Sequence, residues 1–287
     1  MNALYSCSSR CQYFIMESLS DRVRQFCSDH NLKLNKHLGQ HFLIDQSILD
    51  QIIESSEIEE TDHIVEIGPG IGILTTELLK KTGKVTAIEL DKRMIPLLQE
   101  FTNRQPKPNN RLTIINQNAL QTPFPDERYK IVANIPYHIT SPLLRHAFME
   151  SELTPESLTL LIQREVAEKI CNEKSAGMLT ILVNLFGKPK IITRVPPEAF
   201  LPPPKVDSAV LHIECFDKPL AEKPICEEIF KLTKIAFSQK RKMLRKTLGV
   251  FRFGAERLSA LGIDEKRRPQ ELSTQEWVDL ATKWLEY

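Results

Sequence analysis

The sequence Asn134-Ile135-Pro136-Tyr137 combines groups that can hold a flat ring bearing an amino group. It ends an apolar run that predicts a buried strand, and its proline fixes a turn directly after that strand. The side-chain oxygen of Asn134 and the carbonyl of Ile135 can accept hydrogen bonds from an exocyclic amino group, while Tyr137 can stack on the ring. The N6 amino group of adenine fits this description. Taken alone, the motif fits an ordinary strand and turn with a buried tyrosine equally well.

A second candidate group follows the apolar strand predicted at residues 64–67. Gly68, Gly70 and Gly72 form the pattern Gly-x-Gly-x-Gly before a helix predicted at residues 74–81. Glycines at such a strand-to-helix turn let the backbone approach a ligand closely. A dinucleotide-binding fingerprint would need glycine at position 73, which is isoleucine, so a nicotinamide-dependent dehydrogenase is disfavoured.

Two further polar residues stand at the ends of predicted strands. Glu89 closes the strand at residues 84–89, where a carboxylate can accept hydrogen bonds from both hydroxyls of a ribose. Asn118 follows the strand at residues 111–116 and can contact the edge of an adenine ring. Glu89 could also be an ordinary surface acid, but its place after a glycine turn favours ribose binding.

An open α/β sheet is needed to bring these residues together. In a parallel sheet the C-terminal ends of the strands form one crevice, in which ligands bind, so Gly68, Glu89, Asn118 and Asn134 are expected to share one cleft. Apolar runs predict further strands and helices along the chain. The remaining strands are predicted at residues 129–134, 157–162, 191–195 and 208–214, and the helices at residues 18–30, 46–55, 141–149, 164–171 and 177–186.

The sequence allows two interpretations for each of two segments, residues 35–43 and residues 196–204. Residues 35–43 are polar and basic, and their spacing favours a linker into the next helix. They could instead fold over a bound ligand, with Phe42 and Leu43 as an apolar lid. Prolines make the loop at residues 196–204 rigid and present Phe200 in a defined place, either in the core or facing Tyr137 across a flipped base.

From residue 219 the composition changes to helices, predicted at residues 224–238, 240–248, 255–261 and 274–287. With no strand signal, this part is expected to form a separate helical domain. Lys240, Arg241, Lys242 and Arg245 lie near its first junction, and residues 231–255 contain no acid. A solvated helix face can carry such a run, but the absence of acids favours a surface that contacts nucleic-acid phosphates.

Composition sets limits on these interpretations. The 287 residues include 41% hydrophobic ones, enough for one large and one smaller domain, and the net charge of +1 leaves nucleic-acid binding to a local basic surface. No apolar run approaches the roughly 20 residues of a membrane helix. Six scattered cysteines without a Cys-x-x-Cys pair indicate neither a zinc site nor disulfides and fit the cytoplasm. Residues 1–15 lack acids, but an N-terminal extension is favoured over a transit peptide, with Met16 as an alternative start.

With these residues assembled, the chain resembles the ribosomal RNA adenine dimethyltransferases of the KsgA/RsmA family from about residue 34 to residue 284. Six motifs carry the resemblance. They are Leu38-Gly39-Gln40-His41-Phe42-Leu43, Glu66-Ile67-Gly68-Pro69-Gly70-Ile71-Gly72, Asn134-Ile135-Pro136-Tyr137, Gln163-Arg164-Glu165-Val166-Ala167, Pro202-Pro203-Pro204-Lys205-Val206-Asp207-Ser208-Ala209-Val210 and Ala236-Phe237-Ser238-Gln239-Lys240-Arg241-Lys242.

The resemblance implies a Rossmann-like class I methyltransferase sheet of seven strands, the last antiparallel, with a small all-helical C-terminal domain. The implied methyl donor is S-adenosylmethionine, with no metal. The implied target adenine lies between Tyr137 and Phe200, at a catalytic motif that also comprises Asn134, Ile135 and Pro136. The implied donor site comprises His41, Leu43, Gly68, Gly70, Glu89, Asn118 and Asn134.

The resemblance also implies a domain plan and a biological setting. An N-terminal extension and helix at residues 1–33 would precede a catalytic domain at residues 34–217 and an rRNA-binding domain at residues 218–287. The protein would act in the cytoplasm as a monomer, without contact to a membrane. It would dimethylate N6 of two adjacent adenosines near the 3′ end of small-subunit rRNA within the 30S particle, and so contribute to ribosome biogenesis.

Four residues depart from the usual family pattern. The family usually has Asn in place of His41 and Asp in place of Asn118. It usually has Leu in place of Ile135 and often has Asn in place of His138. Asn118 keeps an acceptor oxygen but loses a charge, which is expected to lower donor affinity. The change at His41 is tolerable if the backbone makes that contact.

Three alternatives stay open at this point. Ile135 is frequent in the erythromycin-resistance methylases, which act on large-subunit RNA, although the proline-rich motif and the helical C-terminal region favour the small-subunit enzymes. A DNA adenine methylase would usually carry a second proline in place of Ile135. A largely non-catalytic ribosome assembly factor could use donor binding only as a checkpoint.

Overall fold

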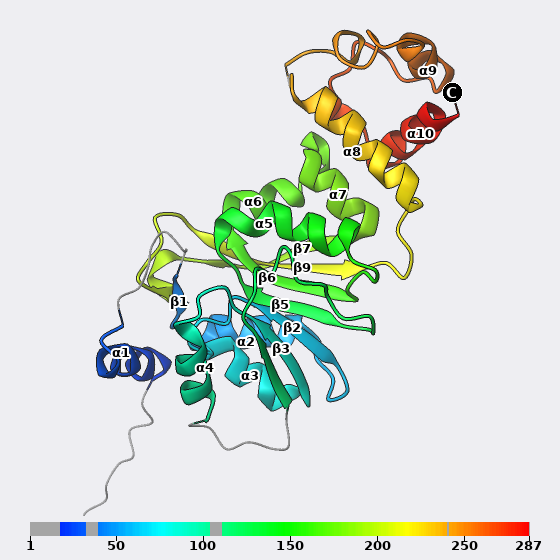
Figure 1. Cartoon of the computed structure of the whole chain (residues 1–287). Coiled ribbons are helices and arrows are strands. Elements are labelled where there is room, and N and C mark those ends of the chain that lie inside the picture. Colours follow the sequence, from blue (N-terminus) through cyan, green and yellow to red (C-terminus); the bar gives the residue numbers. More distant parts are fainter. Residues whose placement is uncertain (1–17, 33–39, 104–110, 240, 287) are drawn as a thin grey trace, which may run out of the picture.

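The computed structural model describes residues 18–32, 40–103, 111–239 and 241–286. Figure 1 shows a central sheet with helices on both of its faces and a further helical region beyond one of these helix layers. Lys240 and residues 35–39 of the candidate lid lie outside the described residues.

The sheet has seven strands in the order β4-β3-β2-β5-β6-β9-β7. The first five of this order run parallel, while β9 pairs antiparallel with both β6 and β7. The predicted sheet of seven strands with an antiparallel last strand is therefore confirmed. Its strands are β2 (His63–Ile67), β3 (Lys84–Ile88), β4 (Arg111–Ile115), β5 (Lys130–Asn134), β6 (Ser157–Gln163), β7 (Gly187–Val195) and β9 (Ser208–Cys215).

Ten α-helices occur in the described part of the chain, and most lie where the apolar spacing predicts them. No helix was predicted for α4, although its buried residues Met94, Leu98 and Phe101 have helical spacing. The helix predicted at residues 141–149 ends early and continues as a π-helical turn, His146–Glu150. The ten are α1 (Leu19–Asp29), α2 (Gln46–Ser55), α3 (Ile73–Lys81), α4 (Met94–Asn103), α5 (Thr140–Arg145), α6 (Arg164–Ile170), α7 (Met178–Phe186), α8 (Lys223–Phe237), α9 (Gly254–Ala260) and α10 (Thr274–Leu285).

Burial on both faces explains why the strands read as unbroken apolar runs. On β5, Val132 belongs to an apolar cluster with α1 to α4, whereas Ile131 and Ala133 belong to a second cluster with α5 to α10. Neighbouring residues of a strand point to opposite faces, so both faces of a parallel sheet covered by helices require continuous apolar sequence.

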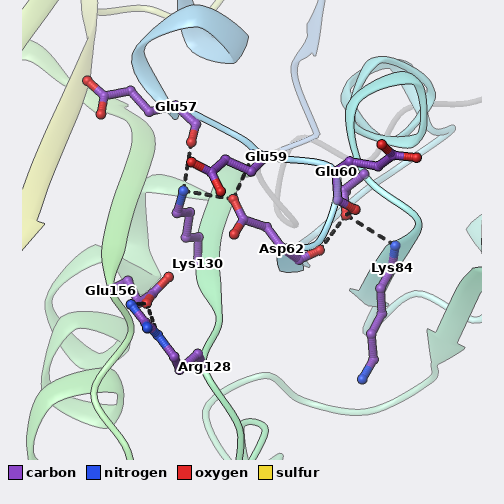
Figure 2. A network of polar contacts seen from close by, with 9 residues as sticks. Glu57, Glu59, Glu60, Asp62, Lys84, Arg128, Lys130 and Glu156 are labelled. Atoms are coloured by element: carbon purple, nitrogen blue, oxygen red, sulfur yellow. Dashed lines mark hydrogen bonds and ion pairs between the residues drawn. The ribbon is translucent and has the colours of Figure 1, made fainter.

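The N-terminal ends of the strands are tied together by paired charges (Figure 2). Lys130 at the start of β5 places its Nζ 2.7 Å from Asp62 Oδ2 and donates a second hydrogen bond to the carbonyl oxygen of Glu57. Arg128 pairs with Glu156 in the same region. Each of these charges has its partner within the protein.

The C-terminal region is helical, as predicted, but its second helix is not formed. Residues 240–248 were expected to be helical, yet the described part of this stretch holds only the 3-10 turn Leu244–Lys246. The N–H groups of Leu244 and Arg245 donate instead to the carbonyl oxygens of Arg267 and Glu265. These contacts with a later segment replace the hydrogen bonds of a continuous helix.

The helical region shares its core with the sheet. Trp277 on α10 is fully buried in the same apolar cluster as Ala236 on α8, Leu182 on α7 and Leu160 on β6. The division into domains at residues 217 and 218 stays a prediction, because one apolar cluster runs through both parts. No helix among the described residues is both long and apolar enough to cross a membrane.

Candidate functional site

A cavity lies at the C-terminal ends of β2, β3 and β5 and is bounded by segments that are distant in sequence. All residues of the predicted donor site line it, so the structure brings together what the strand-end argument expected. These lining residues are His41, Leu43, Gly68, Gly70, Glu89, Asn118 and Asn134. Among the described residues, no group of His, Cys, Asp and Glu side chains could hold a metal ion.

The glycine turn after β2 forms one wall of the cavity. Gly68 and Gly70 have φ values of 68° and 56°, in the left-handed region that glycine adopts without steric cost. A Cβ atom at Gly70 would lie 2.9 Å from Cε1 of Phe42, so the ring packs directly on the turn. Only glycine fits both the backbone conformation and this contact.

Glu89 connects the glycine turn to the loop after β3. Its Oε2 accepts a hydrogen bond from the N–H of Gly70 at 3.2 Å, and its Oε1 accepts one from the N–H of Asp91 at 2.7 Å. Burial raises the pKa of Glu89, while these backbone donors oppose the rise. Each carboxylate oxygen keeps a second lone pair, so the group can still accept hydrogen bonds from two hydroxyls.

Glu66 is a lining residue that was not assigned a role from the sequence. It lies within β2, is 1% exposed, and its Oε2 has no hydrogen-bond partner among the described residues. Burial raises its pKa to about 8. The side chain and backbone of Thr75, which lie close to the carboxyl group, oppose the rise, and the charge of Glu89 adds to it. A buried carboxyl oxygen rarely lacks a hydrogen-bond partner without a reason, so Oε2 of Glu66 is suited to an N–H or cationic group of a ligand. An acid inside the apolar run at residues 64–67 was the available signal.

Asn134 ends β5 with its amide held in one orientation. Its Nδ2 donates to the carbonyl oxygen of His41 at 3.1 Å, which leaves Oδ1 as the group that can accept a hydrogen bond. Ile135 is 2% exposed and is not among the residues that line the cavity. Pro136 lines the cavity, and its Cδ would lie 3.7 Å from a Cβ at Gly68. The motif and the glycine turn are therefore direct neighbours.

Tyr137 is held beside this motif by polar and ring contacts. Its hydroxyl group lies 2.6 Å from Oγ of Ser208, and burial raises its pKa. The rings of Tyr137 and His41 are nearly parallel, with an interplanar angle of 11° and centroids 6.2 Å apart. The ring that was expected to stack on a base is thus kept in a defined orientation.

The candidate lid and the proline-rich loop meet in a two-stranded antiparallel sheet. In it β1 (Phe42–Leu43) pairs with β8 (Phe200–Leu201), and Nδ1 of His41 donates to the carbonyl oxygen of Pro202 at 2.7 Å. The linker interpretation is wrong at residues 42 and 43, because both are buried and line the cavity. Phe200 is 2% exposed, so of its two expected positions the structure shows the one in the core.

The other predicted residues have more ordinary surroundings. Asn118 lines the cavity, and its Oδ1 accepts a hydrogen bond from the N–H of Leu120 at 3.0 Å, which closes a local turn. Arg241, Lys242 and Arg245 are exposed in the C-terminal region and lie outside the cavity. The cavity and the basic residues are therefore two separate surfaces.

The sequence and the fold both match one family. The family model described as ribosomal RNA adenine dimethylase matches residues 31–285. The chain belongs to this family. Two proteins similar to this chain are named ribosomal RNA small subunit methyltransferase A. That of Alkaliphilus oremlandii (strain OhILAs) is 35% identical over 91% of this chain and 95% of its own length. That of Dehalococcoides mccartyi (strain CBDB1) is 39% identical over 93% of this chain and 94% of its own length.

Solved structures of similar proteins agree with the family assignment. A dimethyladenosine transferase from Plasmodium falciparum has a TM-score of 0.75 and 29% identity, over 86% of this chain and 98% of that chain. The 23S rRNA methyltransferase ErmE has a TM-score of 0.65 and 26% identity, over 84% of this chain and 98% of that chain. This chain therefore has the class I methyltransferase fold with an added helical region.

Proposed function

We propose that this chain transfers methyl groups from S-adenosylmethionine to N6 of adenines in small-subunit ribosomal RNA. The observation that carries the proposal is the cavity at the strand ends, where Asn134 presents an oriented acceptor beside a glycine turn and the buried acids Glu66 and Glu89. Family membership and relatives named small subunit methyltransferase A support the choice of substrate.

The lining residues fit S-adenosylmethionine, which when bound would supply a methyl group activated by a sulfonium. Glu89 offers acceptors for ribose hydroxyls, and Gly68 and Gly70 let the backbone approach the ligand. Asn118 would contact the adenine edge. The unpaired Oε2 of Glu66 is suited to the amino group of the methionine part. His41 and Leu43 would close the site from the N-terminal side.

The target amino group needs activation by position. Adenine N6 is a poor nucleophile because its lone pair is delocalised into the ring. Oδ1 of Asn134 and the carbonyl oxygen of Ile135 would accept the amino hydrogens and so direct the lone pair out of that conjugation. Positioning of this kind supplies up to about 7–11 kcal/mol of a barrier. No strong base is needed, since the nitrogen loses its proton readily once it is alkylated.

Tyr137 would stack on the target base, which contributes on the order of 1–3 kcal/mol to holding a flipped nucleotide. Phe200 is the second predicted stacking residue. Its side chain is buried in the apolar cluster with Phe42, so this role requires it to turn out of the core when the base enters. Arg241, Lys242 and Arg245, together with Lys240, would hold the phosphates of the RNA.

Several finer points belong to the same proposal. The substrate would be the 30S particle, the product two adjacent dimethyladenosines near the 3′ end of its RNA, and the modification a step in ribosome biogenesis. The protein would act in the cytoplasm as a monomer. The large-subunit methylase remains the second candidate, because ErmE shares the fold over 84% of this chain.

Transfer of labelled methyl from S-adenosylmethionine to unmethylated small ribosomal subunits tests the proposal. Large ribosomal subunits and duplex DNA serve as parallel substrates, and nucleoside analysis identifies the product. Dimethyladenosine from small subunits alone is expected. Label in large-subunit RNA would favour the second candidate. Donor binding without transfer to any substrate would leave only a non-catalytic assembly role.

A further inference from the structure

The segment between the turn Leu244–Lys246 and α9 exposes apolar side chains. Val250, Phe251 and Phe253 are 67%, 45% and 47% exposed. These three side chains are called the apolar tip below. Residues 250–253 belong to the segment coloured orange in Figure 1, which lies at the outer end of the helical region, away from the sheet. Three exposed apolar side chains within four residues, unlike apolar side chains exposed singly, indicate an interaction site.

The backbone around the apolar tip holds these side chains outward. Before the tip, a Cβ atom at Gly249 would lie 2.8 Å from Cα of Arg245, so the two backbone segments are in direct contact. After it, the N–H of Gly254 donates to the carbonyl oxygen of Phe251 at 2.8 Å. Phe253 has a φ of 62°, which residues other than glycine rarely adopt. The exposure is therefore part of a closely packed loop.

The buried side chain of Arg257 connects the loop that carries the apolar tip to α10. Arg257 is 8% exposed, its Nη1 donates to the carbonyl oxygen of Arg252 at 3.3 Å, and its guanidinium lies 4.5 Å from the ring centre of Trp284. The side chain of Arg252 itself is exposed, and its guanidinium lies over the Phe253 ring at 4.9 Å. Arg257 thus holds the loop in place, while Arg252 adds its side chain to the exposed surface.

The charges around the apolar tip select the kind of partner. Residues 231–255 contain no acid, and Glu256, which is exposed, is the first acid after the tip. Arg241, Lys242, Arg245, Lys246 and Arg252 are exposed on the described part of this stretch. RNA presents phosphates and the flat faces of unstacked bases together, which this combination of cations and aromatic rings matches.

We propose that the apolar tip stacks on an unpaired nucleobase of ribosomal RNA, with Phe251 as the main contact, while the basic residues beside it hold the neighbouring phosphates. The inference rests on the proposed function and deepens it. The nucleobase at the tip would be distinct from the adenine at Asn134, so it would help to recognise the RNA without being modified.

Phe251 variants separate stacking from general apolar contact. Affinity for unmethylated small ribosomal subunits is measured across a salt series for the wild type, Phe251→Ala, Phe251→Leu and Phe251→Tyr. Loss of the ring is expected to weaken binding roughly 5- to 100-fold in the Ala and Leu variants. Tyr should bind like the wild type. The salt slope should stay unchanged, because every cation that faces a phosphate is kept.

A matched control is Leu285→Ala, since Leu285 on α10 is an apolar residue of similar exposure at 49%. It should bind as the wild type does. Unchanged affinity for S-adenosylmethionine checks that each variant is folded. In a second measurement, a photo-crosslinking phenylalanine analogue at position 251 is irradiated with small subunits bound, and a crosslink to RNA is expected.

Three outcomes would overturn the proposal: wild-type affinity of Phe251→Leu, a crosslink to a ribosomal protein, or a crosslink to a second copy of this chain. Methyl transfer by the wild type is recorded in the same samples. Binding that depends on Phe251 without any transfer would contradict only the proposed function. Transfer without dependence on Phe251 would contradict only the role of the tip.

Discussion

The two ends of the strands in the central sheet, called the N-terminal edge and the C-terminal edge below, carry similar polar residues. The two sets of residues differ in whether they have partners within the fold. At the N-terminal edge, Lys130 and Asp62 satisfy each other, and both side chains are 14% exposed (Figure 2). At the C-terminal edge, Oε2 of Glu66 has no hydrogen-bond partner among the described residues, Asn134 presents its Oδ1 as an acceptor, and both residues line a cavity. Polar groups that pair within the fold stabilise it, whereas groups held in place without a partner are available to a ligand.

The largest expected effect is on turnover at the C-terminal edge. Asn134→Ala should lower kcat about 100- to 1,000-fold, the usual loss for one oriented hydrogen-bonding group in an active site. Affinity for small ribosomal subunits should change little, because the basic residues lie outside the cavity. Single-turnover methyl transfer and equilibrium binding measure the two quantities. Asn184→Ala, on α7 outside this cavity, is the control, and equal losses in turnover and binding would contradict the assigned role.

Glu66→Gln tests the unpaired carboxyl group. The folded pKa of Glu66 is about 8 and thus above its unfolded value of 4.5. Between these two pH values the carboxyl group ionises in the unfolded state but stays mostly protonated in the folded state, so wild-type stability should fall as pH rises through this range. The Gln variant lacks this loss and should be more stable at pH 8 by on the order of 2–4 kcal/mol. Denaturant unfolding at pH 5 and pH 8 measures the difference.

The same variant should bind S-adenosylmethionine more weakly than the wild type, and more so at pH 8 than at pH 6. A gain in stability together with a loss in donor affinity would sharpen the contrast between the two edges. An equal stability difference at both pH values would show that Glu66 does not titrate as described.

Lys130→Ala tests the opposite edge. Removing the lysine leaves Asp62 largely buried and without its ion pair, so the free energy of unfolding should fall by about 1–3 kcal/mol. Thermal unfolding measures this loss. Donor affinity and kcat should remain at wild-type values below the melting temperature. A large change in kcat would break the comparison, since the two edges would then be functionally coupled.

The smallest effect concerns the basic residues outside the cavity. Reversing Arg241 and Lys242 to glutamate should weaken RNA binding and flatten its dependence on salt, by about 0.7–0.9 in slope for each phosphate that is no longer neutralised. Donor affinity should be unchanged. Filter binding at several salt concentrations gives the slope, and an unaltered slope would remove this pair from the RNA interface.

The C-terminal edge could be predicted from the sequence because its signals are local. Each of Gly68, Glu89 and Asn134 follows an apolar run directly, and parallel strands bring their ends together wherever the strands lie in the sheet. The antiparallel last strand came from the resemblance to a family. The residue types could not show that Glu66 lacks a partner, because that depends on side chains from several elements.

Features that depend on contacts between distant segments were missed. The pairing of Phe42 with Leu201 joins two segments far apart in sequence, and neither is long enough to give a strand pattern. Phe200 pairs with Leu43 in the same small sheet and is buried, which is one of the two positions predicted for it. The helix expected at residues 240–248 does not form because Leu244 donates its hydrogen bond to Arg267, a partner that helical spacing does not indicate.

Equilibrium binding of S-adenosylmethionine to the wild type and to Glu89→Ala tests the central claim most directly. Glu89 joins the glycine turn to the loop after β3 and is at the opposite end of the strands from Lys130, so Lys130→Ala is the matched control. We expect Glu89→Ala to lower donor affinity at least about 10-fold, as removal of charged hydrogen-bond acceptors does, while Lys130→Ala binds normally. Wild-type affinity in Glu89→Ala would contradict the placement of the donor at the C-terminal edge.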